Sequence, residues 1–579
     1  MQLFEFDVSY FLGRVRSIDT RKIAIQVANE DDIRKARVSR LLAVKIDGPV
    51  EVWLIGIIDR VLKTAVSENV QENDKNTING EVQNDFQNEY PQNTVLSTLI
   101  GTVRWDANKE THTFSRSLAQ LPGIDAECNI LNGKQLESFM NILSSEGSKE
   151  QSLEFGTYVI DEKAIAYLDG NKLFQRHAAL LGSTGSGKSW TVASILERAA
   201  LLPSSNLIVF DLHGEYRELS YARHLRIPGP EDLGDNNKEL LYLPYWLLNA
   251  EEMQAMFIDR SEFSAHNQVM VFQEAVIRQK KETLEALDKH DILAAFTLDS
   301  PIPFSIDNVI AELSELNDEM EQGARGLKQG KFFGQFSRLL TRIRSKMSDR
   351  RYGFLYKAPP EEHQYNSMAA TVRKLLDYKE EYTKIKVIDF SEVPSEILPV
   401  IVGLVARLIY EVQFWTDHNQ RRPVALVCDE AHQYLPNAFN SNPNEQRAVE
   451  AFEKIAKEGR KYGVSLFIVS QRPSDVSTTV LSQCNNLIAL RLTNAEDQNT
   501  VRKMMPESLE SLLEMLPVMD IGEALVVGDA VLLPSTIKVN MPSEKPLSAT
   551  IDFWSRWRET AEAPDLAHAV ENMRKQGRS

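Results

Sequence analysis

The spacing of hydrophobic residues changes along the chain, and each spacing predicts one kind of element. Up to about residue 115, short β-branched runs roughly alternate with polar residues and are separated by turn residues. This pattern is typical of strands in a small β-barrel. From about residue 158, apolar runs of strand length alternate with stretches of helical period, which predicts a parallel α/β sheet. Between residues 230 and 380 the period is mostly helical.

These patterns predict the fold class and three regions. The fold class is α/β, with a P-loop core, a large helical insertion and an N-terminal small β-barrel. The segment at 68–93 is rich in Asn and Gln, which predicts an insertion into the barrel and not part of its core. The predicted regions are a barrel at 1–155 with the insertion at 68–93, a core at 156–540 with the helical insertion at about 225–380, and a C-terminal tail at 541–579.

Composition and charge narrow the functional classes. The chain has 65 Lys and Arg against 82 Asp and Glu, a net charge of −17. This balance disfavours a protein that coats nucleic acid with its whole surface, although a local basic strip can still grip it. The three cysteines form no CxxC pair, which argues against structural zinc and disulfides and favours a cytoplasmic location.

No segment predicts a membrane protein. The N-terminus carries Glu5 and Asp7 and lacks the basic region of a signal peptide. The most apolar stretch, Leu398–Tyr410, contains Pro399 and Arg407. It is too short to span a bilayer and predicts a buried helix.

Residues 182–189 match the phosphate-binding motif G-x-x-x-x-G-K-[ST] in full. In this motif backbone N–H groups at a helix N-terminus surround phosphates, the lysine reaches the β- and γ-phosphates, and the final hydroxyl binds Mg²⁺. A chance Gly-rich turn is the alternative, but the motif follows a predicted strand and opens a predicted helix. The predicted nucleotide-binding residues are Gly182, Ser183, Thr184, Gly185, Ser186, Gly187, Lys188 and Ser189.

A second motif follows the apolar run Val424–Cys428, which ends in Asp429 and Glu430. Asp429 is predicted to bind Mg²⁺ with Ser189, and Glu430 to polarise the water that attacks the γ-phosphate. The alternative is a strand end with two solvated acids. The letters Asp-Glu-Ala-His also match superfamily 2 helicases, but too little chain follows for a second RecA-like lobe.

Two further strand ends are predicted to face the same site, because residues after parallel strands line the ligand crevice. Asp211 is predicted to support the metal or the water, with a turn cap as the alternative. Gln471 is predicted to sense the γ-phosphate, with a satisfied turn amide as the alternative.

Taken together, the motifs resemble the HerA family in the HerA–FtsK group of DNA translocases. The motifs that carry the resemblance are GSTGSGKS, FDLHGEY at 210–216, LPYWLL at 243–248, VCDEAHQYLP at 427–436, EGRKYG at 458–463 and SQRPSDV at 470–476. The resemblance implies a RecA-like ATPase that uses ATP and Mg²⁺, forms a homohexamer and holds DNA in a central pore. It also implies a partner, either a nuclease of the NurA type or, in bacterial phage defence, a sirtuin-like or nuclease effector.

A ring ATPase needs an arginine from the neighbouring subunit to stabilise the transition state. Arg460 matches the position of the family's arginine motif, and Arg176 is a second candidate. Residues Arg325 to Arg351 contain nine basic residues and one acid, and Arg338 and Arg342 lie one helical turn apart, so both are predicted DNA contacts. For all four arginines the alternative is an ordinary solvated or ion-paired cation.

Two functions remain open at this point. The first is an ATP-driven DNA translocase or helicase. The second is a hexameric scaffold in which ATP assembles and activates an effector without moving DNA. A kinase-like P-loop enzyme is disfavoured, because nothing resembles a lid for a small substrate and the paired acids suit hydrolysis.

Overall fold

The computed structural model describes residues 3–46, 51–63, 93–108, 110–118, 120–147, 152–235, 237, 239–323, 326–377, 384–437, 443–548, 553–558 and 566–576. The predicted insertion at 68–93 therefore lies outside the described residues, apart from Asn93. The chain divides into two compact units. The first comprises Met1–Leu173, Leu180–Thr191 and Asn485–Met541, and the second comprises Phe174–Ala179, Val192–Cys484 and Pro542–Ser579.

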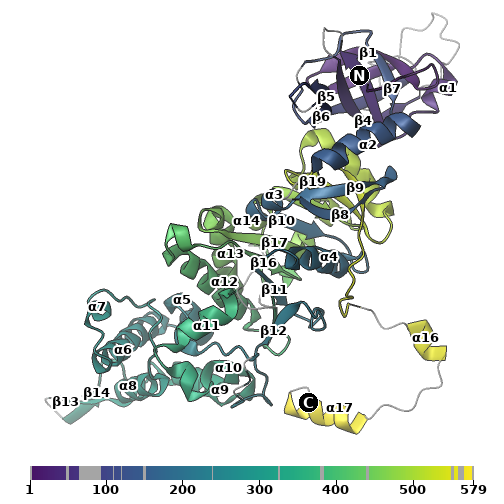
Figure 1. Cartoon of the computed structure of the whole chain (residues 1–579). Helices are drawn as coiled ribbons and strands as arrows, with labels where there is room; N and C mark the ends of the chain where they lie inside the picture. Colours follow the sequence, from purple (N-terminus) through teal and green to yellow (C-terminus); the bar gives the residue numbers. More distant parts are fainter. Residues whose placement is uncertain are drawn as a thin grey trace, which may run out of the picture. The chain divides into compact units, whose positions relative to one another are not determined.

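The first unit begins with the predicted β-barrel (Figure 1). Six antiparallel strands pair in the order β2-β1-β7-β3-β4-β5, and β5 pairs with β2 to close the ring, while β6 adds to β5. Closure removes the unpaired strand edges. The strands are β1 (Phe11–Asp19), β2 (Lys22–Gln26), β3 (Leu41–Ile46), β4 (Val52–Leu62), β5 (Thr94–Asp106), β6 (Thr111–Ser115) and β7 (Glu127–Ile130).

Alternation explains which barrel strands the sequence predicts. Strands β1, β2, β4 and β5 coincide with predicted runs, and their inward side chains form one core with members such as Leu12, Ile25, Leu54 and Leu99. Strand β7, which lies between β1 and β3, was not predicted because it has only four residues.

A second, antiparallel sheet of the same unit has the order β18-β19-β20-β8-β9. Strands β19 and β20 of this sheet form an antiparallel hairpin. Helix α2 (Gly133–Gly147) lies against β9. The strands are β18 (Asn486–Ala489), β19 (Glu523–Gly528), β20 (Ser535–Val539), β8 (Ser152–Tyr158) and β9 (Asp161–Asp169).

The second unit contains a parallel sheet of five strands in the order β12-β15-β11-β16-β17. Strands β11, β15, β16 and β17 are buried along their whole length, as expected when helices cover both faces. This confirms the predicted α/β fold class. The strands are β12 (Ala222–Arg226), β15 (Ile385–Asp389), β11 (Leu207–Asp211), β16 (Val424–Cys428) and β17 (Val464–Ser470).

Helices α12 (Leu398–Trp415) and α13 (Pro443–Tyr462) pack against each other beside this sheet. Helix α12 is long and apolar enough to cross a membrane, but 72% of it is buried inside the protein. The predicted buried helix is therefore present, and it extends five residues beyond Tyr410. Strand β10 (Ala178–Leu181) and helix α4 (Lys188–Ala200) each pass from one unit to the other.

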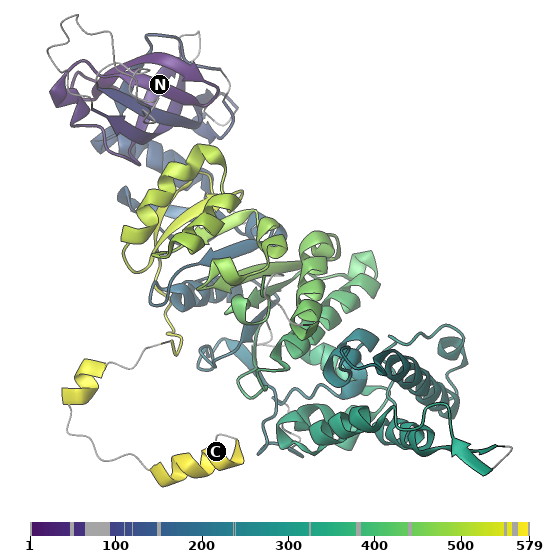
Figure 2. The same ribbon diagram turned by 180° about the vertical axis from the view of Figure 1, so that it is seen from behind.

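The region predicted as helical contains helices and one hairpin (Figure 2). The prediction was wrong at Met320–Gln329, where β13 (Met320–Gly323) and β14 (Gly326–Gln329) pair. Glycines at 323, 326 and 330 interrupt the helical period there. The longer helices are α5 (Ala250–Phe257), α6 (Ala265–Ala286), α8 (Ile306–Asp318), α9 (Ser337–Ser348) and α11 (Ser367–Leu376).

Candidate nucleotide site

In the first unit, the phosphate-binding motif forms the turn between β10 and α4, as predicted. Gly185 and Gly187 have φ values of +73° and +104°, which glycine adopts without strain. A Cβ on Gly182 would lie 2.6 Å from Ser186 Oγ and 2.8 Å from Leu490 Cβ. The turn therefore requires glycine at all three positions.

Contacts within this unit fix the phosphate-binding turn. Ser183 N–H donates to Arg491 C=O at 2.9 Å, and Gly522 N–H donates to Ser186 C=O at 3.2 Å. Lys188 Nζ donates to Ser183 C=O at 3.3 Å, so the ammonium group folds back over the turn. Ser186 Oγ is buried without a hydrogen-bond partner in the described protein. A glycine-lined helix N-terminus with a lysine over it fits the phosphates of a nucleotide.

In the second unit, Asp429 and Glu430 follow β16 directly, as predicted. Asp429 is 5% exposed, and its pKa is raised well above the ordinary value by burial and by the negative charges of Glu430, Glu215 and Asp211. The Tyr434 hydroxyl donates to the Asp429 carbonyl at 3.0 Å and fixes the backbone there. This end of the sheet is thus a buried cluster of carboxylates whose negative charges act on Asp429.

Glu430 has an unusual backbone. Its φ and ψ are +47° and +42°, a left-handed conformation that is uncommon outside glycine. Gln471 Nε2 donates to Glu430 Oε2 at 3.0 Å, and His432 Nδ1 lies 3.3 Å from the same oxygen. The structure therefore brings the predicted base and the predicted sensor into direct contact, together with a histidine that sequence reasoning did not single out.

Asp211 lies at the end of β11 with its carboxylate occupied by the following loop. Oδ1 accepts the backbone N–H groups of His213, Gly214 and Glu215, and Oδ2 accepts that of Tyr216. These are the bonds of the turn-cap alternative. A metal-binding role for Asp211 stays a prediction without support from these contacts.

The structure permits a test of whether magnesium fits. Among the described residues, no group of three or more His, Cys, Asp or Glu side chains is arranged to hold a metal by itself. Mg²⁺ commonly takes only one or two protein ligands and completes its shell with phosphate oxygens and water. The negative charges of the carboxylates around Asp429 therefore fit Mg²⁺ that arrives with a nucleotide.

Arg460 lies at the opposite edge of the sheet from Glu430. Helix α13 returns from the end of β16 to the start of β17, and Val424 pairs with Val464. The sheet is five residues deep here, a span of roughly 16 Å. Arg460 is exposed and forms no ion pair within the described part of the chain. Arg176 is half-buried beside the same edge, just before β10.

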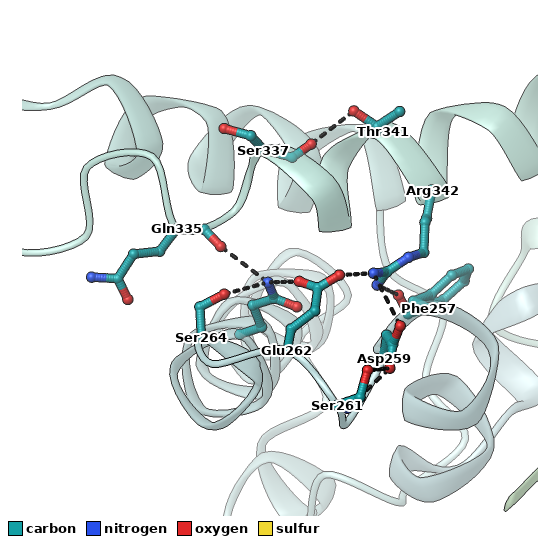
Figure 3. Close-up of polar contacts among 10 residues, drawn as sticks. Phe257, Asp259, Ser261, Glu262, Ser264, Gln335, Ser337, Thr341 and Arg342 are labelled. Carbon is teal, nitrogen blue, oxygen red and sulfur yellow. Dashed lines mark hydrogen bonds and ion pairs between the residues drawn. The ribbon is translucent and has the colours of Figure 1, made fainter.

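The predicted amphipathic helix in the basic strip is present as α9, with Phe336, Leu339, Leu340 and Ile343 buried. Arg342, however, forms an ion pair with Glu262, donates to the Phe257 carbonyl at 3.0 Å and lies 3.9 Å from Asp259 (Figure 3).

These contacts favour the ion-paired alternative for Arg342 and do not support it as a DNA contact. Arg338 is exposed on the same helix, and its DNA contact stays a prediction.

Comparison with known proteins gives the family. Residues 153–409 match the family described as "Helicase HerA, central domain", and residues 402–543 match "Helicase HerA-like C-terminal". The chain is 28% identical over 399 residues to the DNA double-strand break repair helicase HerA of Saccharolobus solfataricus, covering 68% of this chain and 70% of the relative. It is 25% identical over 461 residues to the protein of the same description from Pyrococcus furiosus, covering 75% and 78%.

Two solved structures are similar in part. VirB4 of Thermoanaerobacter pseudethanolicus has 17% identity and a TM-score of 0.46, over 68% of this chain and 97% of that chain. The conjugative coupling protein TrwB has 12% identity and a TM-score of 0.44, over 71% and 93%.

Proposed function

This chain belongs to the HerA helicase family and is an ATPase, and from that premise we propose that it hydrolyses ATP–Mg²⁺ to move or unwind DNA as a homohexamer. The observation that carries the proposal is the partly buried contact between Gln471 and Glu430 at the carboxyl end of the parallel sheet. A base held by an amide that can sense the γ-phosphate suits hydrolysis of a nucleotide.

Each group has a defined task in this proposal. The backbone N–H groups of 182–189 and the Lys188 ammonium bind the phosphates, and Ser189 and Asp429 bind Mg²⁺. Magnesium supplies charge neutralisation for the phosphoryl group. Glu430 orients the attacking water and accepts its proton, while Gln471 positions the Glu430 carboxylate.

The position of Arg460 supports assembly into a ring. Because it lies at the edge opposite Glu430, it is badly placed to serve its own site and well placed to serve a neighbour. The same edge exposes Trp415 by 81% and Leu201 by 73%, at the loops that precede β16 and β11. A head-to-tail ring would cover these side chains. It would also pair the sheet edge that carries Arg460 with the edge of the next copy that carries Asp429 and Glu430.

The proposed partners are DNA in the ring and a nuclease or effector protein, either NurA-like for DNA repair or sirtuin-like or another nuclease for phage defence. The proposed location is the cytoplasm. The family resemblance supports the proposed partners, and the cysteine pattern supports the proposed location. Mass measurement with and without the product of the neighbouring gene tests the protein partner.

The function is tested by separating binding from turnover. Lys188→Ala should greatly weaken ATP binding, because the phosphates lose their cation. Glu430→Gln should keep binding but remove DNA-stimulated hydrolysis. Equal loss of ATP binding in both variants would contradict this division of roles. Effector activation by Glu430→Gln with ATP alone would favour the scaffold function instead.

A further inference from the structure

His177 occupies an unusual position between α3 (Gly170–Gln175) and β10. It is only 4% exposed, and its φ is +53°, a left-handed conformation that a non-glycine residue rarely adopts. Such strained conformations persist only where the surroundings hold them in place, and they cluster at functional sites. The contacts of the imidazole show what holds this one.

Both ring nitrogens bond to main-chain atoms of the second unit. Leu466 N–H donates to Nδ1 at 2.9 Å, so Nδ1 carries no proton. Nε2 therefore carries the proton and donates to the Ala456 carbonyl at 3.1 Å. Burial and the charge of Arg460 lower the pKa of His177, which favours this neutral form.

The two main-chain partners of His177 lie on α13 and β17, and the proposed reaction uses residues that these two elements position. Ala456 lies on α13, one helical turn before Arg460, and its carbonyl is the one that the Arg460 N–H reaches in an α-helix. Leu466 lies on β17, whose end leads to Gln471 and so to Glu430. Phe174 adds a ring contact with Phe467 of the same strand at 6.4 Å.

We infer that His177 is a positioning residue for Arg460, and that it anchors the last turn of α13 to the strand that carries Gln471. This inference rests on the proposed function, because it takes Arg460 as the arginine supplied to the neighbouring subunit. A displacement of β17 at the subunit's own nucleotide is passed through the imidazole of His177 to Arg460, which serves the nucleotide of the next subunit. His177 itself contacts neither nucleotide.

Two substitutions separate the bonds. His177→Asn places an acceptor near the position of Nδ1 but does not reach Ala456. His177→Gln places a donor near the position of Nε2 but loses the bond from Leu466. His224→Asn is the matched control, since His224 lies half-buried in the same unit and also bonds a main-chain carbonyl, that of Leu219, at 2.9 Å.

The experiment uses the full chain and measures kcat, KM, equilibrium ATP binding and melting temperature for each variant. His177→Asn should lower kcat by about tenfold to a hundredfold, the cost of misplacing a catalytic group by about 1 Å. ATP binding should stay within about twofold, because the phosphate-binding turn is intact. His177→Gln should retain more kcat than His177→Asn, and His224→Asn should match the wild type.

Mixed assemblies show through which group His177 acts. A subunit with His177→Asn keeps its phosphate-binding turn, and a Lys188→Ala subunit keeps a well-placed Arg460. Mixing them should therefore restore turnover at the His177→Asn sites, as it should for Arg460→Ala.

The outcomes are distinct. If Arg460→Ala is rescued by Lys188→Ala subunits and His177→Asn is not, the inference is overturned while the proposed function stands. Unchanged kcat in His177→Asn also overturns the inference. So does a loss of turnover that is accompanied by losses of both ATP binding and melting temperature. If Lys188→Ala or Arg460→Ala has wild-type turnover, the proposed function itself fails and the inference fails with it.

Discussion

At the scale of single residues, the site concentrates negative charge in a buried place. Asp429 is buried beside Glu430, and the carboxylates of Glu215 and Asp211 add to the same field. Burying a carboxylate among like charges destabilises the fold. Under the proposed function this cost persists because Asp429 serves as a metal ligand. This trade between stability and function can be measured directly.

We expect Asp429→Asn to raise the stability of the nucleotide-free protein at pH 7 by about 1 kcal/mol while removing ATP hydrolysis. The sign follows from the raised pKa of Asp429. Above the folded pKa of Asp429, the fold carries the full cost of an ionised, buried carboxylate. This cost shrinks as pH falls below the folded pKa, and it is gone below the unfolded pKa of about 3.9.

The melting temperatures of wild type and Asp429→Asn should therefore differ at pH 7 and converge in acid. Asp475→Asn is the control, because Asp475 lies on the surface close to this edge and its carboxylate makes long contacts, 3.5 Å to Ser474 Oγ and 3.8 Å to Arg472. A variant that melts below the wild type at pH 7 would contradict the prediction.

The sequence predicts the chemistry of this site better than its contacts. The phosphate-binding turn, Asp429 and Glu430 are found from motifs because their chemistry demands adjacent residues or fixed spacing. His177 and His432 escape sequence reasoning, since a lone histidine has no periodic signal and its partners lie far along the chain. Ala456 and Leu466 become its partners only after folding.

At the scale of elements, one buried ion pair ties the helical region to the sheet. Arg407 of α12 donates to both oxygens of Glu252 at 2.8 Å, and also to Glu411 at 3.0 Å and to the Leu247 carbonyl at 2.8 Å. Glu252 in turn completes the capping box of α5 with Asn249. One guanidinium thus fixes the start of α5 against the middle of α12.

We expect Arg407→Met to cost about 3 kcal/mol of stability, because it leaves Glu252 buried and uncompensated. Glu252→Gln keeps the capping box but removes the charge. The double variant Arg407→Met/Glu252→Gln should therefore recover a large part of the loss. Denaturant unfolding of the four proteins gives the coupling, and additive losses would show that the pair does not act as a unit.

Two arginines of the basic strip, Arg342 and Arg338, have different expected roles. Arg342→Glu places a carboxylate against Glu262 and Asp259, so we expect a fall in melting temperature. Arg338→Glu changes an exposed side chain, so the fold should be unaffected. If Arg338 contacts DNA, binding should weaken for every sequence, and the slope of log affinity against log salt should flatten by about one. A salt titration with a fixed duplex decides, and an unchanged slope leaves Arg338 as a solvated cation.

The element patterns also show the limit of sequence reasoning. Continuous apolar runs have few other structures available. The buried strand β16 is therefore predicted to the residue, and the buried helix α12 is predicted at its start, although it runs five residues beyond the predicted end. The hairpin at Met320–Gln329 was missed because each of its strands has only four residues.

At the scale of the whole molecule, Arg460 and Glu430 lie at opposite edges of one sheet, so under the proposed function a complete site combines two copies. Lys188→Ala and Arg460→Ala subunits should each be inactive alone. Mixed at equal amounts, they should regain activity at about a quarter of the interfaces, those where an intact Lys188 meets an intact Arg460. ATP turnover of the mixture, with mixing confirmed by mass, is the measurement. Absence of recovery would count against an arginine acting between subunits.

The surface that forms the contact between subunits should be the sheet edge that carries Arg460. Trp415 and Leu201 lie exposed there, and apolar side chains of this size contribute strongly when an interface covers them. We expect Trp415→Glu to shift the assembly toward monomers and to lower turnover, while each monomer still binds ATP at its intact phosphate-binding turn. Phe263→Glu is the control, because Phe263 is fully exposed in the turn before α6, away from that edge.

Mass and turnover should be measured together over a range of protein concentrations. For Trp415→Glu, turnover per subunit should rise with concentration as the weakened contact re-forms, whereas for Phe263→Glu it should follow the wild type. Wild-type mass and turnover in Trp415→Glu would place the subunit contact on another surface. Arg460 would then have to reach its neighbour's nucleotide without a supporting contact from Trp415.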